Sequence, residues 1–124
     1  MQEKKLNIHI KEYTPGPIPD LFHLTRPFAF SYNEYMKTYH YIVQGRVQGV
    51  AFRYSTVRAA RANSITGNVR NLPNGDVEVY AQGEPEKIQQ FEHFLHQGPA
   101  LARVTNVIVE ELDRYKVYED FEVF

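Results

Sequence analysis

The chain has 124 residues, a formal net charge of −1 and no cysteine, with 43% hydrophobic and 23% charged residues. This length and composition suit one globular domain with a modest core. No apolar run approaches the ~20 residues of a membrane helix, and the N-terminus lacks the apolar block of a signal peptide, so we expect a cytoplasmic protein without membrane contact. The absence of cysteine excludes a disulfide framework and a thiolate nucleophile. A nearly neutral charge argues against nucleic acid as the main ligand.

Residues 1–37 differ in composition from residues 38–124, and we expect them to be a separate N-terminal extension. Prolines make residues 14–20 an extended linker, and upstream of it three apolar residues alternate with polar ones, which predicts a short strand: Leu6, Ile8 and Ile10. Alone, this segment and the aromatic stretch from Phe28 to Tyr35 bury too little apolar surface to become ordered, so we expect them to pack on the exposed sheet face or edge of their own or a neighbouring domain. The internal Met36 leaves a second interpretation open, in which the extension reflects only the choice of start site.

Regular elements are predicted from residue 38 onward. Alternating β-branched and aromatic residues predict strands, a 3.6-residue apolar period predicts helices, and Asn74-Gly75 predicts a hairpin turn. In chain order, we expect a strand over 39–47, a helix over 53–64, strands over 65–72 and 76–81, a helix between 83 and 98, a strand over 104–112 and a short strand over 121–124. This order predicts an α+β protein of the split βαβ kind, with an antiparallel sheet carrying both helices on one face.

The segment from Gly45 to Ala51 joins the first expected strand to the first expected helix. Its two glycines allow a tight turn in which successive N–H groups point inward, beside the positive end of the helix dipole. Such a loop suits a tetrahedral oxyanion, but taken alone it is also typical of an ordinary turn. It matches neither the Walker phosphate loop nor the dinucleotide-binding glycine pattern.

Two polar residues favour the oxyanion interpretation. Arg53 stands in the first helical turn, where a cation opposes the helix dipole unless an anion is bound there. Asn71 ends a strand that can neighbour the loop, and its carboxamide can orient water but cannot remove a proton. Alternatively, Arg53 is a surface residue packed on Phe52 or Tyr54, and Asn71 caps its strand.

Two long motifs in the chain resemble the signatures of the acylphosphatases. The stretch GRVQGVAFR at residues 45–53 is similar to their first signature, and GNVRN at 67–71 with NGDVE at 74–78 is similar to their second. The segment from Gly98 to Val104 resembles the one that follows the second helix in that family. The likeness covers about residues 38–124, essentially a whole family domain, and it implies a ferredoxin-like α/β sandwich.

The resemblance also implies a chemistry: hydrolysis of acyl phosphates to carboxylate and inorganic phosphate. By likeness, Arg53 binds the phosphate and Asn71 positions the attacking water. The phosphoryl oxygens would be held by the loop amides of Gln48, Gly49, Val50, Ala51 and Phe52. A carboxylate leaves without a strong acid, so we expect no metal and no cofactor. We also expect a monomer, unless the extension mediates association.

Three residues depart from the family pattern. Asn68 stands where many members carry Trp, and Asn63 with Ser64 replaces a usual Leu-Gly pair. We expect these changes to affect packing and stability rather than chemistry. A second hypothesis is a non-catalytic module of the same fold, which binds phosphate, carbamoyl phosphate or RNA without turnover.

Overall fold

The computed structural model describes residues 36–113 and 116–124. The expected strand at 6–10, like the rest of the extension up to residue 35, lies outside the described residues. In chain order the elements are β1 (Lys37–Arg46), α4 (Phe52–Ala62), β2 (Thr66–Asn71), β3 (Val77–Gly83), α5 (Pro85–Gln97), β4 (Arg103–Leu112) and β5 (Phe121–Val123). Every element expected between residues 38 and 124 is present, and no end differs from its predicted position by more than two residues.

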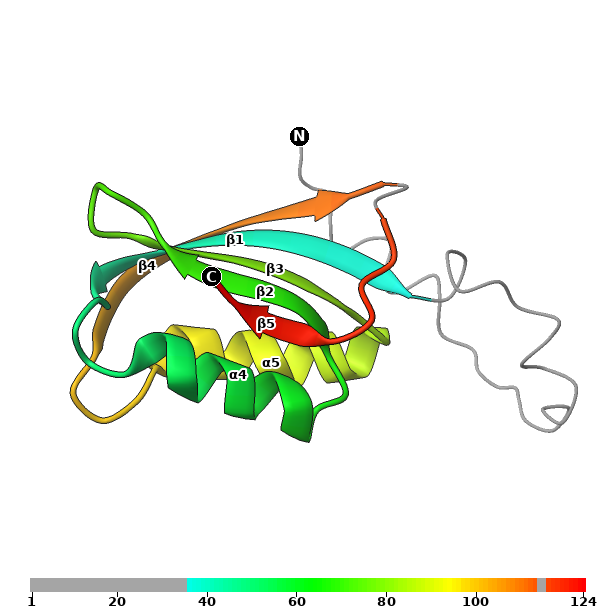
Figure 1. Cartoon of the computed structure of the whole chain (residues 1–124), viewed down its shortest axis with the longest axis horizontal. Helices are drawn as coiled ribbons and strands as arrows, with labels where there is room; N and C mark the ends of the chain where they lie inside the picture. The colour runs from blue at the N-terminus through cyan, green and yellow to red at the C-terminus, as the bar shows by residue number, and fades with distance from the viewer. Residues whose placement is uncertain (1–35, 114–115) are drawn as a thin grey trace, which may run out of the picture.

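The strands form one sheet in the order β4-β1-β3-β2-β5, and both helices pack beneath the same face of it (Figure 1). The predicted α+β sandwich is confirmed, with one correction, because β5 pairs parallel to β2 and makes the sheet mixed rather than wholly antiparallel. The parallel pairing follows from the end of the sheet at which the chain passes from β4 to β5. The end of β4 at Leu112 lies opposite Thr38, at the same end of the sheet where β2 begins. A chain that crosses there enters β5 alongside the start of β2.

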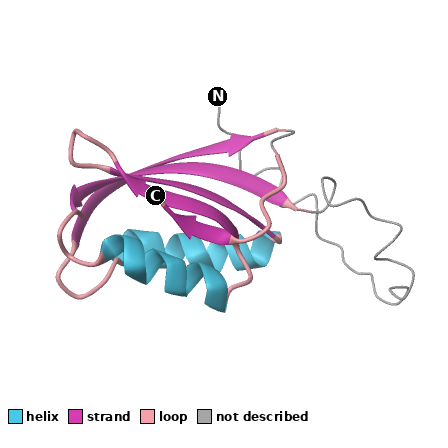
Figure 2. Ribbon diagram, in the orientation of Figure 1, coloured by secondary structure: helices cyan, strands magenta, loops and turns pink. Residues whose placement is uncertain are grey.

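The core lies between the sheet and the two helices (Figure 2). Alternate residues of β1 and β3 are buried on the helix-facing side, as period-2 burial requires. The apolar stripe of α5, Ile88, Phe91 and Leu95, is buried against them. The buried strand residues are Tyr39, Tyr41 and Val43 on β1 and Val77, Val79 and Ala81 on β3.

A buried polar network fixes the crossing that leads to β5. Gln82 donates from Nε2 to the Thr38 hydroxyl at 2.8 Å and to the Lys116 carbonyl at 2.9 Å. Its Oε1 accepts a 3.0 Å hydrogen bond from the Tyr118 amide. Because these buried groups satisfy one another, the crossing is anchored on the sheet and delivers β5 to its position beside β2.

The C-terminus of α4 corrects one prediction. The sequence predicts a helix that extends to Ser64, but α4 ends at Ala62, and Ser64 is exposed with a φ of 57°. The Ser64 amide bonds the Arg61 carbonyl at 3.3 Å and the Ile65 amide bonds the Ala60 carbonyl at 2.8 Å. This pair of bonds is the Schellman motif, in which glycine usually supplies the left-handed residue. Asn63 adds a 2.9 Å side-chain bond to the Ala59 carbonyl. Asn63 and Ser64, the two residues that depart from the family pattern here, therefore form the C-terminal cap of α4.

Ser64→Gly is expected to stabilise the protein. A left-handed conformation costs a residue with a Cβ about 1–2 kcal/mol, and glycine avoids this cost. Glycine also gives the unfolded chain more conformational freedom, which offsets part of the stabilisation. We expect the free energy of unfolding in urea to rise by about 0.5–1 kcal/mol. Ser55→Gly, inside α4, is the matched control and should lower it by about 0.5–1 kcal/mol. Equal losses in both variants would contradict the role of Ser64 as a strained cap.

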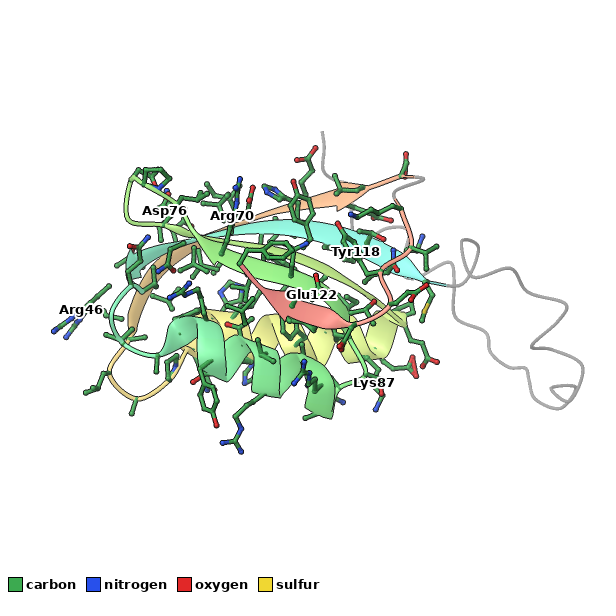
Figure 3. The ribbon with its side chains drawn as sticks, viewed as in Figure 1. Arg46, Arg70, Asp76, Lys87, Tyr118 and Glu122 are labelled. Carbon is green, nitrogen blue, oxygen red and sulfur yellow. The ribbon has the colours of Figure 1, made fainter. Side chains whose placement is uncertain are left out.

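The sheet face opposite the helices carries a charged cluster, in which Arg70 is visible in Figure 3. Glu78 accepts a 2.8 Å hydrogen bond from His40 and a 2.6 Å bond from Arg70. Burial pushes the pKa of Glu78 upward, but the hydrogen bonds from His40 and Arg70 and their charges outweigh it and lower the pKa below 4.5. A carboxyl group whose pKa is lower in the folded than in the unfolded protein stabilises the fold at pH values above its unfolded pKa. This stabilisation is lost as the pH falls through the folded pKa.

We therefore expect Glu78→Gln to reduce the acid sensitivity of the fold. At pH 7 the variant should lose about 1 kcal/mol of unfolding free energy, because Glu78 is largely buried but Arg70 is half-exposed. This deficit should shrink as the pH falls below 4.5, where the wild-type carboxylate becomes protonated. Urea unfolding at pH 3, 4, 5 and 7 measures it. Glu119→Gln changes an exposed carboxylate and is the control, and the same pH trend in both variants would contradict the prediction.

Candidate active site

The loop between β1 and α4 is folded as a concave turn of backbone amides. Gly49 has a φ of 77° and Ala51 a φ of 66°, so left-handed residues alternate with the intervening Val50. This alternation is typical of a nest, in which successive N–H groups point to one spot. Val47 and Val50 are buried and hold the loop to the core. Because Ala51 carries a Cβ in a left-handed conformation, the loop stores about 1 kcal/mol of strain.

The start of α4 leaves its amides available. The helix begins at Phe52 without a side-chain cap and without an acidic residue in its first turn. Among the described residues, no backbone or side-chain group accepts a hydrogen bond from the amides of residues 49–54. These donors and the positive end of the helix dipole together favour an anion at this position.

Gln48 holds this loop to the β2–β3 hairpin. Its Nε2 donates to the Leu72 carbonyl at 2.8 Å and to the Asp76 carbonyl at 2.9 Å. The Leu72 amide also bonds the Asp76 carbonyl, at 2.8 Å, so one side chain joins the loop to the closing pair of the hairpin. Both hydrogen bonds of the Gln48 amide group therefore go to backbone carbonyls, and they fix the distance between the loop and the end of β2.

We expect Gln48→Ala to weaken the binding of inorganic phosphate by about tenfold, because a shift of the amides by a fraction of an ångström disturbs every hydrogen bond in the cradle. The loss of two hydrogen bonds should also lower the unfolding free energy by about 1–2 kcal/mol. Isothermal titration with phosphate and urea unfolding measure the two effects. Gln44→Ala is the control, since Gln44 Nε2 reaches the Asp76 carboxylate at 3.4 Å on the opposite sheet face. Unchanged phosphate affinity in Gln48→Ala would contradict this role.

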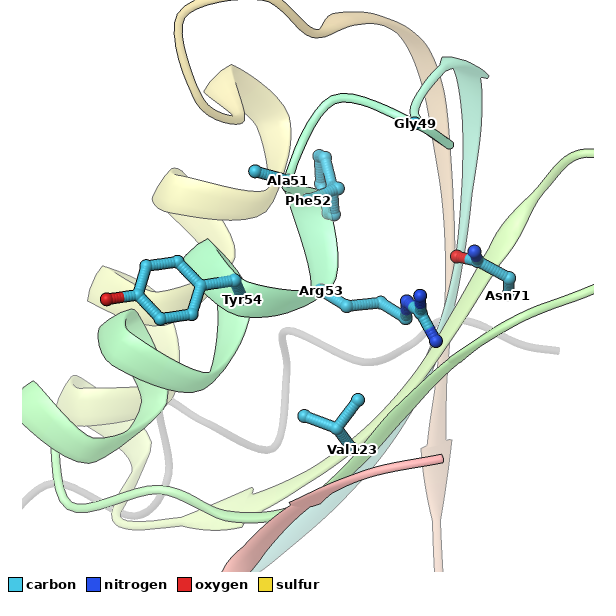
Figure 4. Close-up of a pocket in the computed structure, with 7 residues that line it drawn as sticks. All are labelled: Gly49, Ala51, Phe52, Arg53, Tyr54, Asn71 and Val123. Atoms are coloured by element: carbon cyan, nitrogen blue, oxygen red, sulfur yellow. The ribbon is translucent and has the colours of Figure 1, made fainter.

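Arg53 and Asn71 meet at one pocket beside this loop (Figure 4). The pocket has a volume of about 370 Å³, and the residues that line it are Gly49, Ala51, Phe52, Arg53, Tyr54, Asn71 and Val123. The side chain of Arg53 extends from the first turn of α4 toward Asn71 (Figure 4). Asn71 ends β2, two residues beyond the buried Val69. Period-2 alternation therefore turns its carboxamide toward the helix side of the sheet.

The polar atoms of these two side chains are largely uncommitted. Arg53 Nη1 donates to the backbone oxygen of Phe124 at 3.0 Å. Among residues 36–113 and 116–124, no carboxylate side chain forms an ion pair with Arg53. Asn71 Oδ1 is buried and has no hydrogen-bond partner in this part of the protein. A buried acceptor without a partner is rare and is expected where a ligand or a reacting molecule supplies the bond.

Five of the seven residues expected at the site line this pocket, namely Gly49, Ala51, Phe52, Arg53 and Asn71. Gln48 and Val50 are not among the lining residues, since the first reaches the hairpin and the second is buried.

Two contributions were missed by sequence reasoning. Val123 lines the pocket, and the Phe124 oxygen receives the Arg53 hydrogen bond. Nothing local in the sequence signals either contribution, because both depend on β5 lying parallel to β2. Tyr54 also borders the pocket, but its ring points away from Asn71 (Figure 4).

Neither helix in the described part of the chain is long and apolar enough to cross a membrane. Within residues 36–113 and 116–124, no group of three or more His, Asp or Glu residues is arranged to hold a metal ion. His93 and His96, which share α5, are both exposed.

The fold is a split βαβ sandwich, and the amides of its first strand-to-helix loop have no acceptor in the described part of the chain. With Arg53 and Asn71 beside them, these amides form the kind of arrangement that suits an oxyanion. The relatives of the chain identify the family. The profile of the family named Acylphosphatase matches residues 39–123. An acylphosphatase from Thermococcus kodakarensis is 48% identical over an alignment of 83 residues, with coverage of 63% of this chain and 91% of that protein. Another from Paraburkholderia xenovorans is 46% identical over 87 residues, covering 70% of this chain and 90% of that protein.

Solved structures give the same result. The structure of an acylphosphatase from Coxiella burnetii superposes with a TM-score of 0.70 at 41% identity, covering 73% of this chain and 95% of that one. The chain therefore belongs to the acylphosphatase family.

Proposed function

We propose that this member of the family hydrolyses acyl phosphates to a carboxylate and inorganic phosphate in the pocket between Arg53 and Asn71. The observation that carries the assignment is their convergence beside the loop amides. In the described part of the chain, Arg53 has no carboxylate side chain as a partner and bonds only the Phe124 oxygen, and the buried Oδ1 of Asn71 has no hydrogen-bond partner. The amides of residues 49–53 hold the phosphoryl oxygens, and the guanidinium of Arg53 neutralises their charge with paired N–H donors.

Asn71 orients the nucleophile in this proposal. Its buried Oδ1 accepts a hydrogen bond from a water molecule and aims the water oxygen at phosphorus. The water oxygen forms a bond to phosphorus while the bond from phosphorus to the acyl oxygen breaks. The water proton passes to a phosphoryl oxygen, and the acyl group leaves as a carboxylate. Because Asn does not titrate, the step relies on positioning and charge stabilisation rather than on a side-chain base.

The charge of the site matches the transition state. A loose phosphoryl transfer spreads negative charge over the three equatorial oxygens, and fixed donors in a partly enclosed pocket stabilise that charge without reorganising. A carboxylate is a stable leaving group, so the protein need not supply a strong acid.

The test is release of phosphate from benzoyl phosphate by the purified full chain in the presence of a chelator. We expect turnover that Arg53→Ala and Asn71→Ala each reduce by at least tenfold. Binding of inorganic phosphate without any turnover would instead support the non-catalytic module. Turnover that survives in both variants would leave the activity in place and remove the proposed machinery.

We also propose that the protein acts as a monomer in the cytoplasm. The proposed chemistry uses Arg53, Asn71 and the loop amides, and it requires no residue from a second copy of the chain. Light scattering of the active protein tests the monomer, and fractionation of the cells that produce it tests the compartment.

A further inference from the structure

One edge of the sheet is a long strand with a free side. β4 has ten residues, pairs with β1 on one side, and ends the strand order, so its other side has no strand partner in the described part of the chain. Natural edge strands are commonly short or protected by proline or lysine, because free N–H and C=O groups invite another strand. The β4 sequence, RVTNVIVEEL, contains neither residue.

The core is also incompletely covered along this edge. On β1 and β3 the helix-facing residues are fully buried, whereas on β4 the corresponding residues Val104, Val107 and Val109 are only half-buried. Val107 and Val109 stand opposite Val43 and Tyr41 of β1, so they continue the buried rows to the edge. A further strand with apolar residues on its helix-facing side would complete these rows.

The chain itself contains a segment of that kind. Leu6, Ile8 and Ile10 alternate with polar residues, so in a strand all three would face the same side. β1 begins at Lys37, and its second residue, Thr38, stands opposite Leu112 at the end of β4. A strand that runs antiparallel to β4 would end with Ile10 toward the start of β4. Residues 11–36 would then return along most of β4, about 25 Å, and cross two strand spacings, about 10 Å, before β1 begins, and a segment of this length spans that path easily.

The charges favour one direction for the added strand. Two acidic side chains, Glu110 and Asp113, lie at the end of β4 and are exposed, while Arg103 is exposed at its start. Two lysines, Lys4 and Lys5, come directly before the apolar segment. In the antiparallel direction they approach the acidic end, whereas in the parallel direction they approach Arg103.

We propose that residues 6–10 add to the free side of β4 of their own chain as an antiparallel sixth strand, with Leu6, Ile8 and Ile10 over Val107 and Val109. The occupant is this segment and not a second copy of the protein. The addition pairs the backbone groups of the edge and blocks it from other chains.

Cross-linking tests the proposal directly, because the chain has no cysteine of its own. Val109→Cys is combined in the full chain with Leu6→Cys, Ile8→Cys or Ile10→Cys, and disulfide formation is followed in a glutathione redox buffer at micromolar protein. Neighbouring residues on adjacent strands have Cβ atoms near enough for a disulfide. We expect at least one of the three pairs to form an intramolecular disulfide with an effective concentration at least tenfold above that of a control pair.

The matched control is Ile8→Cys with Glu122→Cys, which places the second thiol on β5 at the opposite edge of the sheet. Equal cross-linking of every pair, control included, would overturn the proposal, since it would show a segment without a preferred position. Disulfide-linked dimers formed by the Val109 pairs would also overturn it and would assign the edge to a second copy. Phosphate release by the reduced variants monitors the active site, so a failure of the proposed function is recorded separately.

Discussion

Arg53→Ala is expected to lower kcat/KM for benzoyl phosphate by a few hundred-fold. A guanidinium that pairs with a phosphoryl group in the transition state contributes about 3–4 kcal/mol, and each 1.36 kcal/mol is a factor of about ten in rate. The affinity for inorganic phosphate should fall as well, because the same cation binds the ground-state anion. Arg53→Lys should recover only part of the loss, since an ammonium supplies a point charge but not two parallel donors.

The structure provides a matched control for this variant. Arg58 lies on the same helix, one turn beyond Tyr54, with its guanidinium 5.8 Å from the centre of the Tyr54 ring. Arg58→Ala removes the same charge from α4. Its one ring contact is with Tyr54, which borders the pocket but whose ring points away from Asn71, so kcat/KM should stay within about twofold. Equal losses in the two variants would mean that the net charge of the helix, and not the position of Arg53, supports the reaction. Urea unfolding of Arg53→Ala verifies that the fold persists.

The local parts of the fold could be predicted from the sequence because their causes are local. Asn74-Gly75 specifies its hairpin, and the side chain of Asn74 accepts a 3.0 Å bond from the Asp76 amide. Gly98 ends α5 as expected, with a φ of 70°. Gly45 is needed for a further reason: a Cβ there would collide with the Arg103 carbonyl at the irregularity between β1 and β4.

The features that sequence reasoning missed depend on contacts between distant segments. Ser64 fits the helical period, but the Schellman bonds to Ala60 and Arg61 end the helix before it. Likewise, the role of Val123 follows from the parallel pairing of β5 with β2, which depends on the anchoring of Lys116 and Tyr118 on the sheet by Gln82. Motif likeness pointed to Arg53 and Asn71 together, and both line one pocket, although it did not reveal that Gln48 contacts the hairpin.

Asn71→Ala should separate catalysis from binding and from stability. We expect kcat for benzoyl phosphate to fall by about 100-fold, the loss typical of a misplaced nucleophile, while the affinity for inorganic phosphate changes by less than about threefold. The unfolding free energy should not decrease and should rise by up to about 1 kcal/mol, because the variant removes a buried acceptor that has no partner in the folded protein.

Asn68→Ala is the control on the same strand, since Asn68 lies on the opposite face of β2 and does not line the pocket. It should leave kcat unchanged within about twofold, because it alters β2 without changing the carboxamide that faces the loop. A loss of stability in Asn71→Ala that accounts for its loss of activity would make Asn71 a structural residue. An Asn71→Ala variant with full kcat would remove water positioning from the mechanism, and Arg53 with the loop amides would then carry the reaction alone. A gain in stability together with a loss of kcat is the combination that only a functional role predicts, since selection for turnover explains why a buried oxygen is kept without a partner.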